Sequence, residues 1–526
     1  MLIILLVGMV LRLYALEDIY LWHDETDWFD EEVYGHKTLG ILRYAALKAQ
    51  EHSVDPGWPI IVRLACKALG GTAMVARMPS VLFGTAAILA IFFLVYCVLK
   101  PHLRNSAFVP ACFAALLTAI SIPQIEFSQR TYPFGTIPFL TTLIVMLHLE
   151  IVNLIQDDRL SIGKFSILAF LYALVAGFSI FLHMSFSVVL VSSFLVLLVL
   201  ARRVIKLNGQ NQVTYIGISA LAVLSVFLAW IGNVIHLSPN QTGYRPYLAS
   251  YYHQLDSGAI FFLLARAYDV MTYHLNLFYN DALYWPRQLN PVLLPLVGLC
   301  IFGWTYAFIG KFGRGAKHLS LLAVICLFLT AVLSLLKKYP FGGVRQTLFM
   351  TPFLFSFTAM GFYTLVRPSK LKPIGIVLAV AYIILWVVNL PNFYQERILP
   401  FESKELLATW EQCGKLKVYT LDNCKDSIKY RLHKHSKVEV QNLPLPSLPN
   451  DPPFLIVSTH WTIEDDLWRP QLKEEIKRSG YITTLIMKRV PKYPVQRDFM
   501  QSLYWPPNGL WVYKITTDEK PLERNP

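Results

Sequence analysis

The chain has 526 residues, of which 55% are hydrophobic, 14% aromatic and only 15% charged, and its mean hydropathy is +0.45. Because a soluble globular chain carries about 25% charged residues, this composition excludes a soluble protein and indicates one with many membrane spans. The net charge of +13 is spread over short loops and a C-terminal segment, without a basic and aromatic stripe, which excludes a nucleic-acid partner and favours lipid headgroups or phosphate-bearing molecules.

The first apolar segment covers residues 2–16. It has no basic stretch before it and no small-residue cleavage site after it, so we expect a retained span rather than a removable signal. A polar first loop follows, residues 17–72. Within it, the patterns of residues 33–50 and 58–69 predict two amphipathic helices lying in the membrane interface.

About eleven membrane spans are expected in all. Besides the first, they cover residues 81–99, 107–122, 135–154, 165–182, 186–200, 215–235, 292–309, 319–336, 347–366 and 373–390. A tight turn is expected at His183. Residues 260–278 contain Arg266, Asp269 and His274, and this segment is therefore expected to be an interfacial or re-entrant helix.

Basic residues gather in alternate loops, which predicts that those loops are cytoplasmic. They lie at residues 100–104, 159–164, 202–206, 311–317 and 367–372. The opposite side holds the first loop, the turn at His183 and the loops 124–132, 236–290 and 337–345. The loop 337–345 is basic although it is on the outer side, and a bound phosphate would explain that exception.

From residue 391 onward the composition becomes that of a soluble domain. Strands are predicted at residues 416–421, 438–440, 454–458, 481–487 and 510–515, with a helix at 471–479. We therefore expect a membrane domain, residues 1–390, and a small extracytoplasmic α/β domain, residues 391–526. An oxidising compartment would permit a disulfide between Cys413 and Cys424, and the sequence leaves that pairing open.

A pair of carboxylates, Asp24 and Glu25, comes directly after the first span. Acidic runs usually solvate a loop, and that is the interpretation for the neighbouring Asp27 and Asp30. For Asp24 we favour a general base, because a carboxylate at a membrane surface can take a proton from a hydroxyl nucleophile. Glu25 would assist Asp24 or admit a divalent cation, since hard cations prefer carboxylate oxygens.

Several short motifs follow one another between residues 5 and 365. They are Leu-Arg-Leu (11–13), Leu-Trp-His-Asp-Glu (21–25), Asp-Pro-Gly-Trp-Pro (55–59), Ala-Arg-Met-Pro-Ser-Val-Leu-Phe-Gly (76–84), Ser-Gln-Arg-Thr-Tyr (128–132) and Gly-Val-Arg (343–345) with Pro352. In this order they resemble the GT-C-type integral membrane glycosyltransferases, specifically the protein mannosyltransferase and aminoarabinose-transferase-like group. Two departures stand out: Asp55 begins the motif that usually reads His-Pro-Pro-Leu-Tyr, and Arg130 lies two residues closer to Gln129.

The resemblance implies an inverting transfer of a sugar from a polyprenyl-phosphate donor to an acceptor hydroxyl at the outer membrane face. The acceptor would be a glycan, a lipid or a protein, no cofactor would be required apart from the divalent cation that Glu25 would admit, and the setting would be the bacterial inner membrane. Such a reaction needs cations at the departing phosphate. The candidates for that role are Arg345, Arg130, Lys337, Lys338 and Arg77.

Three further residues, Tyr132, Asp55 and Trp58, are candidates for substrate contacts. Arg77 and one of the two lysines have an alternative role as anchors at lipid headgroups. A transporter or flippase of lipid-linked saccharides would also want outer basic residues, but it should carry ionisable groups or broken helices at mid-membrane. A membrane scaffold with a partner-binding outer domain would leave Asp24 and Glu25 unexplained.

Overall fold

The structure is a computed structural model of the chain. It describes residues 1–17, 57–156, 162–207, 212–236, 251–253, 258–276, 293–367, 370–397, 410–412, 417–420, 440–442, 453–458, 478, 481–489 and 510–517. Contacts divide the chain into two compact units. The first, which ends at Pro391, holds nearly all of the helical structure, and the second holds the strands that follow.

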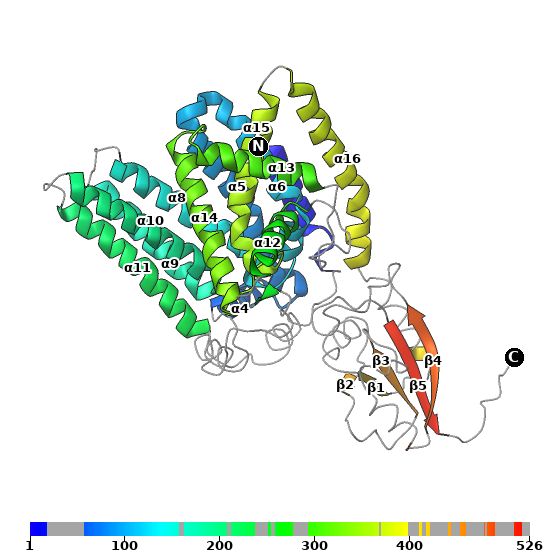
Figure 1. Cartoon of the computed structure of the whole chain (residues 1–526). Helices are drawn as coiled ribbons and strands as arrows, with labels where there is room; N and C mark the ends of the chain where they lie inside the picture. Colours follow the sequence, from blue (N-terminus) through cyan, green and yellow to red (C-terminus); the bar gives the residue numbers. More distant parts are fainter. Residues whose placement is uncertain are drawn as a thin grey trace. The chain divides into compact units, whose positions relative to one another are not determined.

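The first unit is a bundle of helices (Figure 1). The helices are α1 (Leu2–Leu13), α4 (Gly57–Leu69), α5 (Ala73–Leu103), α6 (Phe108–Ile120), α7 (Ile122–Ser128), α8 (Ile137–Gln156), α9 (Ile162–Leu182), α10 (Phe186–Leu207), α11 (Gln212–His236), α12 (Ala259–His274), α13 (Leu294–Phe308), α14 (Arg314–Leu335), α15 (Thr351–Val366) and α16 (Lys372–Arg397). Short 3-10 turns connect some of them: η2 (Arg104–Ala107), η3 (Pro133–Thr136) and η7 (Arg345–Met350).

Six segments of the described chain are long and apolar enough to cross a membrane, and shorter apolar helices accompany them. The six are Ala73–Ile120, Pro133–Gln156, Gly163–Leu182, Arg314–Leu335, Arg345–Val366 and Lys372–Pro391. The protein is thus a multi-pass helical membrane protein, as its composition indicates. The number of about eleven spans stays a prediction.

Helix α5 begins well before the span predicted at residue 81. Thr72 caps its first turn by accepting a hydrogen bond from the Val75 amide at 3.2 Å, which is the usual role of a threonine N-cap. The early turns carry Arg77 and Ser80, both fully buried. Because these polar groups face protein rather than lipid, they can be part of the helix. A prediction from hydropathy alone starts the helix only after them.

The connection predicted at residues 124–132 lies between two candidate spans, but it contains a helix, and its place on the outer side stays a prediction. Helix α6 ends at Ile120, the chain turns at Ser121, and α7 follows with Pro123 in its first turn, where proline's fixed φ suits a helix start. Every residue of α7 is buried. The polar side chains that suggested a loop are therefore inside the protein.

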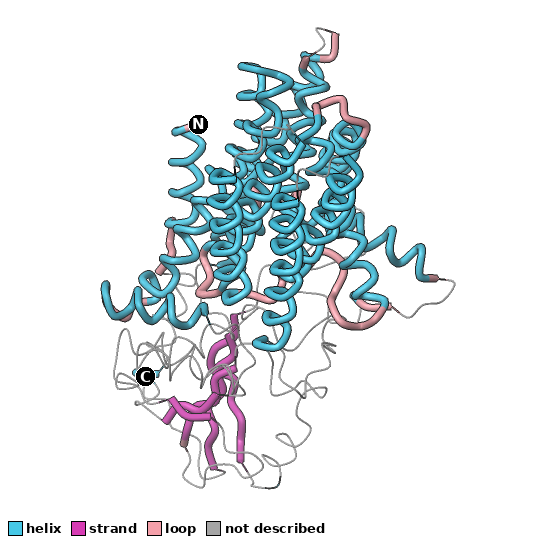
Figure 2. Tube along the Cα trace, turned by 90° about the vertical axis from the view of Figure 1, so that its left-hand side faces the viewer, coloured by secondary structure: helices cyan, strands magenta, loops and turns pink. Residues whose placement is uncertain are grey.

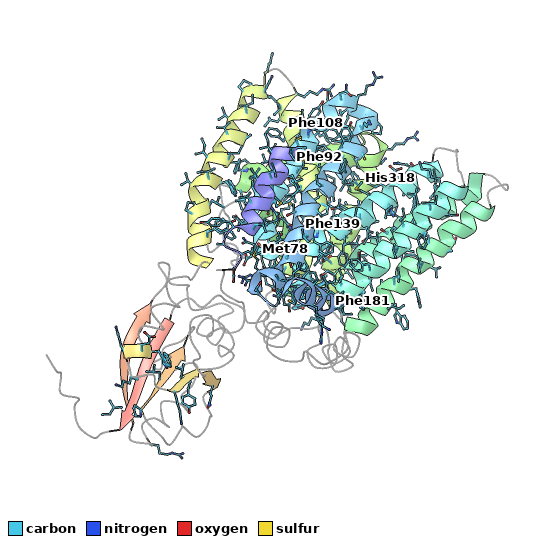
Figure 3. The ribbon with its side chains drawn as sticks, turned by 180° about the vertical axis from the view of Figure 1, so that it is seen from behind. Met78, Phe92, Phe108, Phe139, Phe181 and His318 are labelled. Atoms are coloured by element: carbon cyan, nitrogen blue, oxygen red, sulfur yellow. The ribbon has the colours of Figure 1, made fainter. Side chains whose placement is uncertain are left out.

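Two other local predictions are confirmed. The sharp break at His183 separates α9 from α10, and the Ser185 amide donates to His183 Nδ1 at 3.0 Å. The helix predicted at 58–69 is α4. Helices α9, α10 and α11 pack together at one side of the bundle (Figure 1). Gly57, at the start of α4, lies against Phe181 of α9 (Figure 3).

The second unit contains a five-stranded sheet in the order β2-β1-β3-β5-β4, drawn in magenta in Figure 2. Its strands are β1 (Lys417–Thr420), β2 (Val440–Asn442), β3 (Phe454–Ser458), β4 (Tyr481–Arg489) and β5 (Leu510–Thr517). Strand β1 pairs in parallel with β2 and β3, whereas β5 pairs antiparallel with β3 and β4. Four of the predicted strands are therefore confirmed, and β2 begins at the last residue of the strand predicted at 438–440. The predicted helix at 471–479 and the Cys413–Cys424 pair fall almost entirely outside the described residues.

Candidate active site

Arg12 fixes the helix that carries much of the candidate site. Its guanidinium donates to the carbonyl oxygens of Thr118 (2.9 Å) and Ala119 (3.2 Å). Both carbonyls belong to the last turn of α6, where no intrahelical partner exists and the helix dipole is negative. Arg12 Nε also donates to Ser128 Oγ at 3.1 Å. One buried cation thus joins α1, the end of α6 and the end of α7.

Gln129 binds the C-terminal end of α1 in the same way as Arg12 binds that of α6. Its side-chain amide donates to the carbonyl oxygens of Leu11 (3.1 Å), Arg12 (3.2 Å) and Tyr14 (3.1 Å). Those carbonyls are the unsatisfied acceptors of a helix C-terminus. Gly84 of α5 completes the junction, because a Cβ there would collide with Ser128 and lie 3.2 Å from Arg12 Nε. Three motifs that are far apart in sequence therefore meet at one point.

Arg77 lies in the same region and is fully buried. It donates to the carbonyl oxygen of Leu16 at 2.7 Å, and so holds the chain where it leaves α1. Trp58, in α4, is also fully buried. Neither side chain faces solvent in the structure, and the roles predicted for them in phosphate and substrate binding stay predictions.

Arg130 forms a buried ion pair with Glu126. The distance between Arg130 Nη2 and Glu126 Oε1 is 3.4 Å, and the two side chains are 1% and 7% exposed. A charge in such surroundings needs a partner of opposite sign, and an acid four residues earlier on a helix supplies one. The positive charge of Arg130 is balanced by this carboxylate.

Arg345, the first residue of η7, lies over two aromatic rings of the η3 segment. Its Cζ atom is 5.6 Å from the centre of the Tyr132 ring and 4.9 Å from that of Phe134. The two rings stack almost in parallel, 5.0 Å apart. Aromatic faces attract a guanidinium, so these two rings help to hold Arg345 in its place.

The electrostatics of Tyr273, in α12, connect these two groups. Burial raises the pKa of the Tyr273 phenol well above its ordinary value; the Glu126 carboxylate raises this pKa further, whereas the Arg345 cation lowers it. Both charges therefore act on one hydroxyl. The segments around Glu126, Tyr273 and Arg345, which come from three distant parts of the chain, converge in the fold.

The basic loop 337–345 contacts several neighbouring segments. Tyr339 donates through its hydroxyl to Ser185 Oγ, with 2.6 Å between the two oxygens, and lies equally close to the Gln346 carbonyl oxygen. A Cβ on Gly342, where φ is +151°, would touch the Tyr251 ring and lie 3.1 Å from Arg266. Lys337 is half-buried and Lys338 is exposed, and their amides close the end of α14. The loop thus packs on α12 and on the α9–α10 turn.

The acidic pair Asp24 and Glu25, and also Asp55, lie outside the described residues, so the predicted base is not located. Among the described residues, no group of three or more His, Cys, Asp or Glu side chains could hold a metal ion. The structure brings together Arg345, Tyr132 and, through Tyr273, the Glu126–Arg130 pair. The sequence analysis missed Glu126; an acid four residues before Arg130 in a buried segment is the signal that could have revealed it.

The class defined by this architecture is a multi-pass helical membrane protein with a buried, charged site between distant helices. No family model matches the sequence, and no curated protein matches it significantly. Among solved structures, the chain is similar to the Archaeoglobus fulgidus oligosaccharyltransferase tethered with an acceptor peptide, at 11% identity over 92% of this chain and 68% of that one, with a TM-score of 0.53.

Two further solved structures are similar at a TM-score of 0.48. ArnT from Cupriavidus metallidurans bound to undecaprenyl phosphate is 11% identical over 99% of both chains. The archaeal enzyme AglB with an inhibitory peptide and a dolichol-phosphate is 10% identical over 82% of this chain and 63% of that one. This chain spans 61–69% of the length of the archaeal structures. The likeness at a TM-score of 0.53 shows that this chain has the fold of the archaeal oligosaccharyltransferase structure, and the fold is thus consistent with the one that the motifs predict.

Proposed function

We propose that this protein is an inverting glycosyltransferase that moves a sugar from a polyprenyl-phosphate donor to an acceptor hydroxyl at the extracytoplasmic face of a membrane. The observation that carries the proposal is the position of Arg345: it lies on the Tyr132 and Phe134 rings. It begins η7, which packs on η3 and α12, and both of these also contact α7, the helix of Glu126. The order of the sequence motifs and the GT-C fold support it.

The donor's leaving group is a phosphate. It needs no proton, but negative charge develops on it as the glycosidic bond breaks, and preorganised cations stabilise that charge. We assign the direct contact to Arg345, because a guanidinium meets a phosphate through two parallel N–H bonds. Arg130 is paired with Glu126 at 3.4 Å, and this neutral pair is a weaker candidate for the phosphate contact than Arg345. Lys337 and Lys338 belong to the same basic loop.

The acceptor hydroxyl is a poor nucleophile and must lose its proton as the new bond forms. We assign that role to Asp24, with Glu25 beside it, on the basis of the motif alone. The acceptor attacks the anomeric carbon, the bond to the phosphate oxygen breaks, the proton passes to Asp24 and polyprenyl phosphate leaves. A divalent cation held by Glu25 would add to the charge at the phosphate.

The experiment compares Arg345→Ala, Arg345→Lys and the wild type. Loss of Arg345 should reduce turnover by about 10- to 1,000-fold, as with other lost electrostatic stabilisers, and lysine should restore only part, because the planar fork is gone. Arg314→Ala, at an exposed arginine that begins α14, is the matched control. Transfer of labelled sugar and binding of a polyprenyl phosphate would be measured on protein shown to be folded.

Two outcomes would count against the proposal. Wild-type transfer and binding by Arg345→Ala would mean that another cation holds the phosphate. Binding of the lipid-linked sugar without release of polyprenyl phosphate, in the presence of candidate acceptors, would instead favour a transporter.

A further inference from the structure

A chain of buried side-chain hydrogen bonds runs from α7 to the residue that precedes Arg345. Gln124 Nε2 donates to Thr351 Oγ1 at 3.0 Å. Thr351 Oγ1 lies 3.0 Å from His274 Nδ1, and His274 Nε2 lies 3.5 Å from Thr347 Oγ1. Thr347 Oγ1 in turn donates to the Val344 carbonyl oxygen at 2.7 Å. We call these four side chains the relay.

The directions of these bonds are mutually consistent. Because Thr351 accepts from Gln124, its own proton is available to His274 Nδ1, and a neutral imidazole then carries its proton on Nε2. That proton points to Thr347, whose hydroxyl proton goes to Val344. The ring is fully buried, and burial lowers the pKa of His274 to about 3, so it stays neutral with one donor and one acceptor.

The relay connects the two parts of the candidate site. Gln124 precedes Glu126 on α7, a helix that Arg12 and Gln129 hold in place. At the other end, Val344 directly precedes Arg345. Two further hydrogen bonds to backbone carbonyls join the start of α7 to the end of α12: Ser121 Oγ donates to the His274 carbonyl oxygen, and the Ile122 amide donates to the Asn276 carbonyl oxygen, both at 3.1 Å. Helix α12 thus lies between α7 and η7 and contacts both.

Close packing leaves little room for η7 to shift. A Cβ on Gly343 would lie 2.9 Å from both the Asp269 carbonyl oxygen and Tyr273 Cβ, in α12. The relay residues are 0–5% exposed, so water cannot easily replace a lost bond, and a partner left unsatisfied in such a place is costly. Loss of one hydroxyl should therefore loosen the turn that carries Arg345.

We propose that Thr347 and His274 are positioning residues: the relay holds η7 against α7 so that Arg345 keeps its place for the contact with the donor phosphate. The inference rests on the proposed function of Arg345 as a phosphate contact. It goes beyond that function because it gives α12 a role: this helix positions the segment that carries Arg345.

The test uses Thr347→Val, which removes the hydroxyl at nearly constant shape, and Thr347→Ser, which retains it. Affinity for undecaprenyl phosphate is measured in both, and in Thr358→Val, the control at a fully buried α15 threonine whose hydroxyl donates to the Leu354 carbonyl oxygen of its own helix. We expect Thr347→Val to weaken binding roughly three- to tenfold, the effect of one lost hydrogen bond. Thr347→Ser and Thr358→Val should bind as the wild type does.

A double variant separates positioning from general destabilisation. In an Arg345→Ala background, Thr347→Val should add no further loss, because the group it positions is gone. Amide hydrogen exchange of the peptide containing residues 342–350 is the readout that needs no ligand: it should quicken in Thr347→Val and not in Thr347→Ser.

Unchanged binding and exchange in Thr347→Val, or a loss that simply adds to that of Arg345→Ala, would overturn the inference. If Arg345→Ala itself binds the lipid normally, the phosphate assignment fails, and hydrogen exchange alone then decides whether the relay positions η7.

Discussion

Asp269 pairs with Arg266 within α12, with 2.6 Å between the charged atoms. Burial raises the pKa of the Asp269 carboxyl to about 6, although the Arg266 cation opposes this shift. In the unfolded chain the same carboxyl titrates near its ordinary value of 3.8. As the pH falls from about 6 to 4, the folded protein therefore takes up a proton that the unfolded chain does not. Protonation in that window favours the folded state.

The protonation of Asp269 leads to a prediction about single residues. Asp269 should make the unfolding free energy rise as the pH falls through the window between 6 and 4, and Asp269→Asn should abolish that contribution. The measurement is the thermal midpoint of wild type and variant at several pH values in detergent, taken as a difference so that other groups cancel. A difference that does not change between pH 7 and 4.5 would show that the carboxyl titrates normally.

At the scale of the elements, the junction of α1, α5 and α7 is held by close approach as well as by hydrogen bonds. A methyl group on Gly84 would collide with Ser128 and crowd Arg12. Gly84→Ala should therefore destabilise the fold by about 1–3 kcal/mol, the usual cost of overpacking. The matched control is Gly177→Ala in α9, where a Cβ meets nothing within 4 Å. Equal thermal midpoints for the two variants would contradict this account of the junction.

Many of the helices and strands could be predicted from the pattern of the sequence. Strands β3, β4 and β5 are runs rich in β-branched, aromatic and other apolar residues, which a single sequence is enough to detect. Helix α4 and the His183 break are visible from spacing and apolar runs. Helix α7 was not predictable in this way, because Gln124, Glu126 and Ser128 look like an exposed loop until their partners are known. Those partners, Thr351, Arg130 and Arg12, come partly from distant elements.

The same limit applies to the candidate site. Arg345 and Tyr132 were predicted from motifs, and the structure brings them together. His274 and Thr347 carry no local signal for a role in the site, because that role depends on which helices pack around them. The only local signal of Glu126 is its spacing of four residues from Arg130. Arg77 was proposed as a phosphate contact, yet it donates to a backbone carbonyl at 2.7 Å, a partner that no pattern in the sequence indicates.

At the scale of the whole molecule, the alternation of basic loops predicts the orientation in the membrane. Residues 206 and 314 should lie in cytoplasmic loops, and the C-terminal domain should lie outside the cytoplasm. Single cysteines at positions 208 and 450, in a background without other cysteines, should be labelled by an impermeant reagent from opposite sides. Labelling of both positions from the same side would contradict the predicted orientation of one of the two segments.

The central claim is a transfer reaction, and a single-turnover assay tests it most directly. Purified protein is mixed with a radiolabelled polyprenyl-phosphate sugar and candidate glycan, lipid and protein acceptors, and labelled product and released polyprenyl phosphate are followed together. Asp24→Asn keeps the shape of the side chain but cannot take a proton, so it should slow transfer by about 10²–10⁴-fold with donor affinity nearly unchanged. Asp27→Asn and Asp30→Asn are the matched controls and should change little.

We predict that the wild type releases one polyprenyl phosphate for each sugar transferred and that Asp24→Asn does neither at a comparable rate. Donor binding without transfer to any acceptor by the wild type would contradict the claim that this protein is a glycosyltransferase, and native transfer by Asp24→Asn would contradict the assignment of its base.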